Sequence, residues 1–264
     1  MGGFLLSGGS MRELLEQVLV IAKQADHAIM AVYGREFDVT VKVDNSPLTE
    51  ADQAAHKVIL HGLQALPLHY PILSEEDVEG FSGVGQDGRY WLVDPLDGTK
   101  EFIKRNGEFT VNIALIEHGV PILGVVTAPV TGVAYLAAEG VGAYKIAPDG
   151  QRTRLQVAGR PAEGAMWRVL GSRSHHDPAL TDWLAALGPY QMHPMGSSLK
   201  SCLIAEGQAD VYPRFGPTSL WDTAAAHAVV RYAGGRIETL EGQPLSYANP
   251  AETLNPSFIV WGYS

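Results

Sequence analysis

The order of the periodic segments is the feature that most constrains the fold of this 264-residue chain. Residues 11–33 place apolar side chains at helical spacing without a glycine or proline, and residues 45–66 repeat the pattern after Thr49, a candidate N-cap. Period-two or short apolar strand patterns cover residues 37–43, 71–77, 109–130 (turning at His118-Gly119) and 133–146. This order predicts two helices and a mostly antiparallel sheet, which together form an α+β half.

Strand and helix patterns alternate after a change of composition at residues 147–165. Strand, helix, turn with helix, strand and helix patterns follow in that order at residues 167–177, 178–187, 196–210, 210–215 and 223–235. Such alternation predicts a layered α/β half. We therefore expect an α+β half at residues 11–147, an α/β half at residues 148–264, and a functional site between them. Residues 1–10 precede the regular pattern and are expected to be a leader or a flexible tail.

Charge and cysteine content limit the classes of partner. The formal net charge of −10 argues against a nucleic-acid polymer or an anionic membrane as the main partner. A small anionic substrate stays compatible if cations stand between it and the protein. Cys202 is the single cysteine, so an internal disulfide is excluded and a reducing compartment is favoured. No apolar run has the length of a transmembrane segment, and we expect a cytoplasmic monomer or homodimer, with peripheral inner-membrane association as an open alternative.

A short motif at residues 91–102, WLVDPLDGTKEF, ends an apolar run in two aspartates. Because Pro95 cannot donate a ladder hydrogen bond, we expect the strand to end there. Thr99 is expected to be the N-cap of a short helix that starts at Lys100. A plain surface turn is the alternative, since Asp-Pro and Asp-Gly are common turn dipeptides.

The same motif can collect oxygen ligands and phosphate donors. Its turn can bring the carboxylates of Asp94 and Asp97 to the carbonyl oxygen of Leu96, and an all-oxygen set of this kind suits Mg²⁺. The backbone N–H groups of Gly98 and Thr99 lie beside them at a helix N-terminus, which favours a phosphate.

Acidic residues also follow other apolar segments or open other helices: Asp52, Glu75, Glu76 and Asp222. Each has a simpler explanation. Asp52 and Asp222 would be favoured by a helix dipole, and the two glutamates could be solvated. Together they predict that several strand and helix ends deliver carboxylates to one place.

Three motifs occur in a fixed order: SEED at residues 74–77, WLVDPLDGT at 91–99 and LWDTAA at 220–225. In this order and spacing the chain resembles the inositol monophosphatase-like, magnesium-dependent, lithium-sensitive phosphatases from Met11 to the C-terminus. Residues 97–116, 196–200 and 212–218 resemble the bisphosphate nucleotidase branch of that family. The resemblance implies a layered αβαβα sandwich with the active site between its two halves.

The resemblance also implies a cluster of two or three Mg²⁺ ions. Its implied ligands are Glu75, Asp94, the carbonyl of Leu96, Asp97 and Asp222. Thr99 is implied to orient the attacking water, Glu75 or Asp52 to accept its proton, and the Gly98 and Thr99 amides to hold the scissile phosphate. The implied substrate-binding set is Glu75, Leu96, Asp97, Gly98, Thr99, His175, Gly196, Ser197, Ser198, Lys200 and Asp222.

Simpler roles remain open for several members of the second half and for one basic cluster. Lys200 is implied to pair with a phosphate that does not react, and a solvated helix lysine is the alternative. His175 has the alternative of an exposed turn histidine, and Arg214 could support either substrate or fold. Lys100, Lys104 and Arg105 are expected to form a solvated face. Cys202 is expected to be a small apolar helix residue.

Three functions compete on this basis. The leading one is hydrolysis of the 3′-phosphate of adenosine 3′,5′-bisphosphate to AMP and phosphate, with 3′-phosphoadenylyl sulfate as a further substrate. The second is the same chemistry on inositol or other sugar phosphates. The third, from another class, is a non-catalytic phosphate- or metal-binding protein. A thiol or structural zinc mechanism has no support from one cysteine and no HExxH-type histidine pair.

Overall fold

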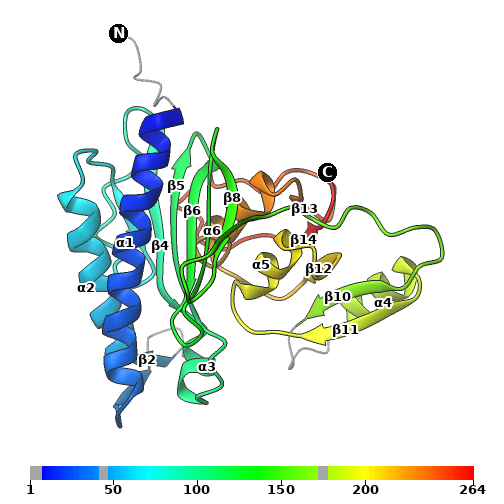
Figure 1. Cartoon of the computed structure of the whole chain (residues 1–264), viewed down its shortest axis with the longest axis horizontal. Coiled ribbons are helices and arrows are strands. Elements are labelled where there is room, and N and C mark those ends of the chain that lie inside the picture. Colours follow the sequence, from blue (N-terminus) through cyan, green and yellow to red (C-terminus); the bar gives the residue numbers. More distant parts are fainter. Residues whose placement is uncertain (1–7, 42–46, 172–177) are drawn as a thin grey trace.

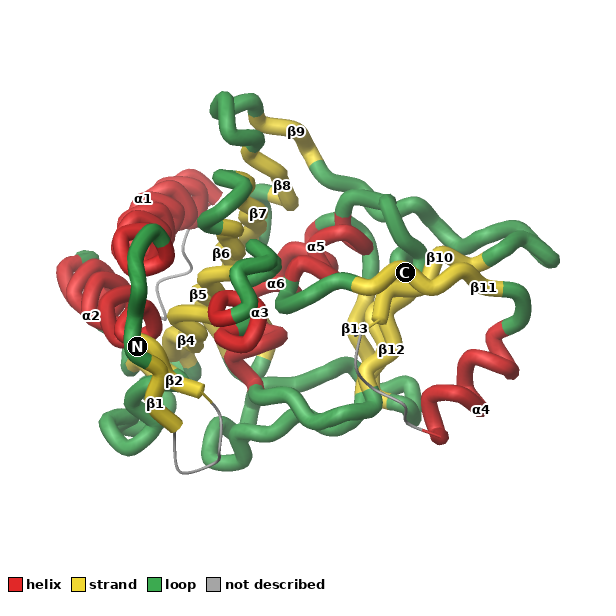
Figure 2. The backbone as a smooth tube through the Cα atoms, turned by 90° about the horizontal axis from the view of Figure 1, so that it is seen from below, coloured by secondary structure: helices red, strands yellow, loops and turns green. Residues whose placement is uncertain are grey.

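The chain folds into five alternating layers of helices and strands (Figure 1). The computed structural model describes residues 8–41, 47–171 and 178–264. Helices α1 (Gly8–Tyr33) and α2 (Glu50–Ala65) cover one face of a seven-stranded sheet, and α5 (Leu199–Ala205) and α6 (Leu220–Tyr232) cover the other. A five-stranded sheet and then α4 (Pro178–Leu187) complete the layers (Figure 2). The predicted αβαβα sandwich is therefore confirmed.

The seven-stranded sheet consists, in spatial order, of β3 (Ile72–Ser74), β4 (Arg89–Asp97), β5 (Thr110–Glu117), β6 (Val120–Ala128), β7 (Val133–Ala138), β8 (Gly142–Ile146) and β9 (Arg152–Arg154). Among the described strands of this sheet, only β3 and β4 pair in parallel. Period-two alternation sends Trp91 and Val93 into the core beneath α1 and α2, while Tyr90 and Leu92 pack towards α5 and α6. The predicted helices and strands of the first half are confirmed in position over the described residues. Residues 42 and 43 of the strand predicted at 37–43, and residues 1–7 of the predicted leader or tail, lie outside the described residues, while α1 already begins at Gly8.

The five-stranded sheet consists, in spatial order, of β11 (Tyr190–Pro194), β10 (Trp167–Gly171), β12 (Val211–Arg214), β14 (Phe258–Trp261) and β13 (Arg236–Thr239). A separate pair, β1 (Val39–Val41) and β2 (Pro47–Thr49), precedes α2, and α3 (Thr99–Ile103) follows β4. The predicted division at residue 147 falls between β8 and β9, which pair with each other. The division into two halves at that residue stays a prediction.

Close packing fixes α6 against the seven-stranded sheet. A Cβ atom built on Gly124 of β6 would lie 2.2 Å from the carbonyl oxygen of Ala225. Only glycine therefore permits this separation between helix and strand. The contact matters for function because α6 begins close to Asp222.

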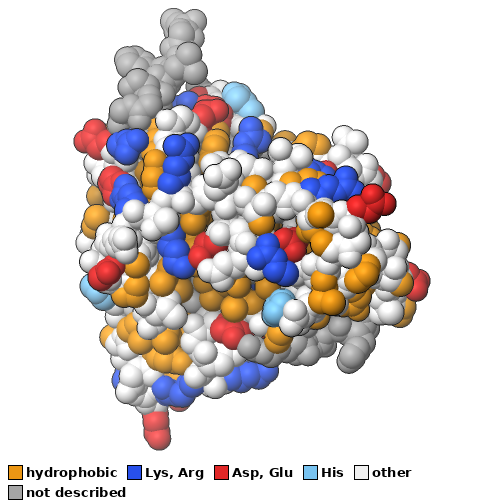
Figure 3. Space-filling model, turned by 45° about the vertical axis from the view of Figure 1, so that its right-hand side comes forward, with side chains coloured by type: hydrophobic (Ala, Val, Ile, Leu, Met, Phe, Trp, Pro, Cys, Tyr) orange, Lys and Arg blue, Asp and Glu red, His pale blue; other side chains and the backbone are white. Residues whose placement is uncertain are grey.

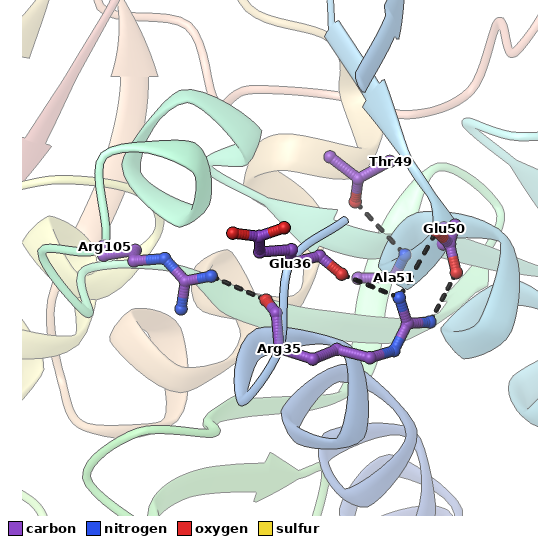
Figure 4. Close-up of polar contacts among 6 residues, drawn as sticks. All are labelled: Arg35, Glu36, Thr49, Glu50, Ala51 and Arg105. Carbon is purple, nitrogen blue, oxygen red and sulfur yellow. Dashed lines mark hydrogen bonds and ion pairs between the residues drawn. The ribbon is translucent and has the colours of Figure 1, made fainter. Parts of the chain in front are cut away.

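Three chain segments meet at the start of α2 (Figure 4). The hydroxyl of Thr49 accepts a hydrogen bond from the backbone N–H of Ala51 at 3.2 Å, which confirms Thr49 as the N-cap. The guanidinium of Arg35 pairs with the carboxylate of Glu50 at 2.5 Å, and Arg105 donates to the carbonyl oxygen of Arg35 at 2.7 Å. Arg105 therefore fastens the end of α1 to the segment that follows α3.

The contact between Asp26 of α1 and Thr127 of β6 predicts a stability effect. The Thr127 hydroxyl donates to Asp26 at 2.5 Å, but burial dominates and raises the pKa of that carboxyl to about 6. The folded protein then binds a proton more tightly than the unfolded chain, so this group lowers stability as pH rises from about 4 to about 6. We expect Asp26→Asn to raise the free energy of unfolding at pH 7.5 by roughly 1–3 kcal/mol.

Thermal unfolding between pH 4 and 8 measures this effect. The stability difference between Asp26→Asn and the unchanged protein should grow with pH and level off above pH 6. The exposed Asp182 of α4 supplies a matched control, since its asparagine variant removes a helix carboxylate without removing a buried one. Equal stability of the Asp26 variant and the unchanged protein at pH 7.5 would contradict the argument.

Candidate active site

The end of β4 carries the central motif of the site. The strand does not end at Pro95, as we expected, but continues to Asp97. Its pairing with β5 shifts register between Asp94, which faces Asn112, and Asp97, which faces Thr110. Because a bulge takes intervening residues out of the ladder, the missing N–H of the proline breaks no regular pairing.

A left-handed glycine turns the chain from β4 into α3. Gly98 has φ of 98° and is the N-cap of α3, so Thr99 is the first helical residue and the predicted Thr99 cap is wrong. The Thr99 hydroxyl instead donates to the Oδ1 atom of Asp52 at 3.2 Å. It also lies 3.4 Å from the carbonyl oxygen of Leu96. The turn therefore brings three of the predicted site residues together.

Asp52 and Asp222 occupy equivalent places in their helices. Each is the third helical residue and closes a capping box, Asp52 with Thr49 and Asp222 with Ser219. The Oδ2 atom of Asp52 accepts from the Thr49 N–H at 2.8 Å, and the Oδ2 atom of Asp222 accepts from the Ser219 N–H at 2.9 Å. The helix-end explanation is thus correct for one oxygen of each carboxylate, and the other oxygen of Asp52 contacts Thr99.

Four carboxylates from three segments interact electrostatically: Glu75 after β3, Asp94 and Asp97 on β4, and Asp222 on α6. Asp94 is 1% exposed, and burial raises its pKa well above the ordinary value. The negative charges of Glu75, Asp97 and Asp222 raise that pKa further, and Glu75 hydrogen-bonds to Asp94. Burial and the charge of Asp97 raise the pKa of Asp222 to about 8. The cluster therefore concentrates negative charge that cations or protons must neutralise.

The cluster is open. Among the described residues, no three acidic, histidine or cysteine side chains already stand in metal-coordinating geometry. The donor chemistry nevertheless fits a hard cation, because the predicted ligands are all oxygens and the carboxylates of Asp94 and Asp222 are buried beside other negative charges. An open arrangement suits Mg²⁺, which keeps several of its waters. Glu76, by contrast, accepts a hydrogen bond from Gln53 at 3.2 Å.

A cavity of about 490 Å³ lies beside this cluster. Predicted residues that line it are Asp97, Gly98, Lys100, Lys104, Gly196, Ser197, Ser198, Lys200, Arg214 and Asp222. Sequence reasoning missed other lining residues: Glu101, Asn106, Met195, Ser201, Tyr212, Thr218, Thr223 and Phe258. Five of these lie within the stretches 97–116, 212–218 and 220–225 but were assigned no role there, because only the fold brings them to the cavity.

Lys200 is a buried lysine of α5 that lines the cavity. The residue is only 6% exposed to solvent, so the alternative of a solvated helix lysine is wrong. The ammonium donates to the carbonyl oxygen of Met195 at 3.2 Å and lies 5.2 Å from the centre of the Tyr212 ring. Burial lowers the pKa of Lys200 to about 8, while the charge of Asp97 opposes that shift. A buried cation thus lines the same cavity as the carboxylates of Asp97 and Asp222.

The turn before α5 is hydrogen-bonded to two carboxylates, Glu108 just before β5 and Asp97 at the end of β4. Glu108 accepts from the backbone N–H of Gly196 at 2.8 Å. The N–H and hydroxyl of Ser198 both donate to the Oδ2 atom of Asp97, at 2.6 and 2.7 Å. Ser197 between them has φ of 46°, a left-handed conformation that a non-glycine residue rarely adopts. Substrate contacts of these three residues stay predictions.

Three further predicted residues fall in different environments. His175 lies outside the described residues. Cys202 is buried in α5, as expected of a small apolar residue, and burial raises the pKa of its thiol. Arg214 donates to the carbonyl oxygens of Gly216 and Pro217 at 3.1 and 3.0 Å and also lines the cavity.

The fold and this acidic site define the class of protein. Residues 10–258 match the inositol monophosphatase family, and the chain belongs to that family. The predicted family is thereby confirmed. The family is metal-dependent, typically with Mg²⁺.

Several known proteins named CysQ are similar to this chain in sequence or structure. The chain is 55% identical over 249 residues to the 3′(2′),5′-bisphosphate nucleotidase CysQ of Escherichia coli K12, covering 94% of this chain and 99% of the relative. It is 54% identical over 252 residues to CysQ of Salmonella typhimurium, covering 95% and 100%. The crystal structure of CysQ from Bacteroides thetaiotaomicron matches with a TM-score of 0.78 at 39% identity, covering 94% and 97%. The predicted bisphosphate nucleotidase branch is confirmed by these relatives.

Proposed function

We propose that this chain is a 3′(2′),5′-bisphosphate nucleotidase that hydrolyses the 3′-phosphate of adenosine 3′,5′-bisphosphate to AMP and phosphate. 3′-Phosphoadenylyl sulfate is a further substrate of the same chemistry. One observation carries the proposal: a buried lysine and the carboxylates of an acidic cluster line one cavity of about 490 Å³, a size that suits a nucleotide. Similarity to the CysQ nucleotidases supports it.

The acidic cluster would hold two or three Mg²⁺ ions. The proposed ligands are Glu75, Asp94, the carbonyl oxygen of Leu96, Asp97 and Asp222. When bound, such ions lower the pKa of a coordinated water and neutralise charge on the leaving oxygen of an in-line displacement. The protein supplies the fixed oxygens and the partly enclosed site in which this chemistry is effective.

Residues at the start of α3 would orient the attacking water and bind the reacting phosphate. The Thr99 hydroxyl donates to Asp52, so this pair can orient a water and Asp52 can accept its proton. Glu75 is the alternative proton acceptor, since its carboxylate adjoins Asp94. The backbone N–H groups of Gly98 and Thr99 would hold the phosphate oxygens as negative charge develops on them.

Other residues of the cavity lining would bind the rest of the nucleotide. Lys200 is proposed to pair with the 5′-phosphate, because it is the deeply buried cation in the cavity lining. Arg214 and Ser197 lie on the same lining and would contact the phosphate or ribose. A substrate with one phosphate would leave the Lys200 charge without an anionic partner.

The surface fits a small-molecule partner. Basic and acidic side chains are interspersed over the described part of the face in Figure 3. A nucleic-acid polymer instead favours a continuous basic surface. None of the described helices is both long and apolar enough to cross a bilayer.

Phosphate release from adenosine 3′,5′-bisphosphate and from inositol 1-phosphate, measured side by side, tests the proposal. We expect strong preference for the nucleotide, dependence on Mg²⁺ and inhibition by Li⁺. Preference for the inositol ester would keep the metal site and overturn the proposed substrate. Nucleotide binding without phosphate release from either compound would support a non-catalytic binding protein instead.

A further inference from the structure

Ser198 lies at the centre of a hydrogen-bond network that joins four chain segments. Its N–H and hydroxyl contact Asp97 at the end of β4 at 2.6 and 2.7 Å. The hydroxyl also lies 2.7 Å from the carbonyl oxygen of Asp222 on α6. The side-chain amide of Asn112 on β5 donates to the same hydroxyl oxygen at 2.9 Å. Thr110 in turn donates to the Oδ1 atom of Asn112 at 3.0 Å, which fixes the orientation of that amide.

The network determines which way the Asp97 carboxylate points. Both donors of Ser198 meet Oδ2, and the amide of Asn112 lies 3.3 Å from the same atom. The Oδ1 atom takes part in none of these contacts. Hydrogen bonds to a carboxylate are stronger than neutral ones, so several of them on one oxygen resist rotation of the group. The other oxygen is thereby held in one direction.

Burial makes this arrangement more rigid than surface contacts would be. Ser198 is 5% exposed and Asn112 is 1% exposed. The single hydroxyl proton of Ser198 has two acceptors, Asp97 and the carbonyl of Asp222, while Asn112 supplies the hydrogen bond that the hydroxyl oxygen accepts. Every polar atom of the pair is therefore used within the protein, which leaves the Ser198 hydroxyl poorly placed to recognise a substrate.

We infer that Ser198 and Asn112 are positioning residues for metal binding: they orient the Asp97 carboxylate and join it to the start of α6. The inference rests on the proposed function only in taking Asp97 as a metal ligand. It changes the expected role of Ser198 from a substrate contact to a support of the metal site. Residues that orient a metal ligand commonly affect metal affinity by about 10- to 100-fold when they are removed.

Titration of the purified protein with Mn²⁺ alone, followed by the electron paramagnetic resonance signal of free Mn²⁺, tests the inference without substrate. Ser198→Ala is expected to weaken Mn²⁺ binding about tenfold or more. The Mg²⁺ concentration for half-maximal phosphate release should rise by a similar factor. At saturating Mg²⁺, KM for adenosine 3′,5′-bisphosphate should change less than about twofold, because the hydroxyl contacts the carboxylate and no substrate atom.

Conservative and second-site variants separate positioning from general damage. Ser198→Thr keeps the hydroxyl and should restore most of the Mn²⁺ affinity. Asn112→Ser is expected to weaken binding in the same direction, and its combination with Ser198→Ala should be no worse than the more severe single variant, since the two residues act in series. Ser246 is an exposed serine whose alanine variant should leave Mn²⁺ affinity unchanged.

The outcomes are distinct. Unchanged Mn²⁺ affinity in Ser198→Ala, together with a KM raised tenfold, would overturn the inference and make Ser198 a substrate contact. Additive losses in the double variant would overturn the role of Asn112. Weaker Mn²⁺ binding in Ser198→Ala, together with no phosphate release by the unchanged protein, would contradict the proposed function and leave the positioning role standing.

Discussion

Asp97→Asn is expected to lower Mg²⁺-dependent phosphate release by at least about a thousandfold. Asparagine keeps the size of the side chain and an oxygen that can accept from Ser198, so the contacts of the turn before α5 can persist. It removes the negative charge that a metal ligand contributes, and charge stabilisation by a bound ion is worth several kcal/mol in the transition state. Each loss of about 1.4 kcal/mol slows the reaction tenfold.

The same substitution should stabilise the protein in the absence of metal. The charge of Asp97 raises the pKa of both Asp94 and Asp222, which shows that these carboxylates repel one another. Asparagine removes part of that repulsion. We therefore expect thermal unfolding without Mg²⁺ at a higher temperature than for the unchanged protein, and a smaller further increase when Mg²⁺ is added.

Phosphate release and thermal unfolding, each with and without Mg²⁺, measure these two effects on one preparation. Asp149→Asn is the matched control, since Asp149 is an exposed turn aspartate that accepts from the backbone N–H of Gln151. An Asp97 variant with near-normal turnover would contradict the metal-ligand assignment. If the Asp97→Asn variant is both inactive and unstable, its loss of phosphate release would be due to a folding defect.

Regular periodicity explains which elements the sequence predicts well. Buried strands such as β5 and β6 alternate side chains between two cores, and α1 and α2 place one apolar face on the sheet, so their patterns are strong. The strand β11, with the sequence YQMHP, has five exposed residues and alternates apolar and polar side chains over only four positions before a proline, so its signal is weak. The exposed three-residue strand β9 was missed for the same reason.

Local turn chemistry predicts where the carboxylates gather but not how they are supported. The Asp-Pro-Leu-Asp-Gly turn and the capping positions of Asp52 and Asp222 are properties of short sequence segments. The rule for proline failed at Pro95 because the ladder is irregular there. The resemblance implied that Ser198 and Lys200 belong to the site. The contacts of Ser198 and the burial of Lys200 depend on β4, β5, β12 and α6, which are remote in sequence, so no local pattern could have shown them.

Lys200→Met is the second substitution with a large expected effect, this time on substrate preference. A hydrogen bond to a charged group contributes about 1.5–3 kcal/mol, so kcat/KM for adenosine 3′,5′-bisphosphate should fall about 10- to 150-fold. Methionine preserves most of the volume that packs against Tyr212. Adenosine 3′-monophosphate lacks the 5′-phosphate, and its kcat/KM should change less than about threefold.

Burial of the charged Lys200 also lowers the free energy of unfolding. The pH dependence of this effect can be measured only on folded protein, so it also tests whether Lys200→Met folds. Burial lowers the pKa of Lys200 from 10.5 to about 8, so the folded protein binds this proton less tightly than the unfolded chain does. The charged lysine therefore lowers stability below pH 8, and this penalty disappears as pH rises from about 8 to about 10.5. At pH 7 we expect Lys200→Met to raise the free energy of unfolding by roughly 1–3 kcal/mol.

Kinetics with the two nucleotides and denaturant unfolding at pH 7 and pH 10 measure both effects. Lys57 on α2 is exposed, and its methionine variant supplies the control for loss of one lysine charge. Equal losses of kcat/KM for the bisphosphate and the monophosphate would contradict recognition of a second phosphate by Lys200. A loss of kcat/KM for the bisphosphate alone, in a variant that is more stable at pH 7, would show that the buried ammonium binds the substrate. The ammonium would then contribute nothing favourable to the stability of the fold.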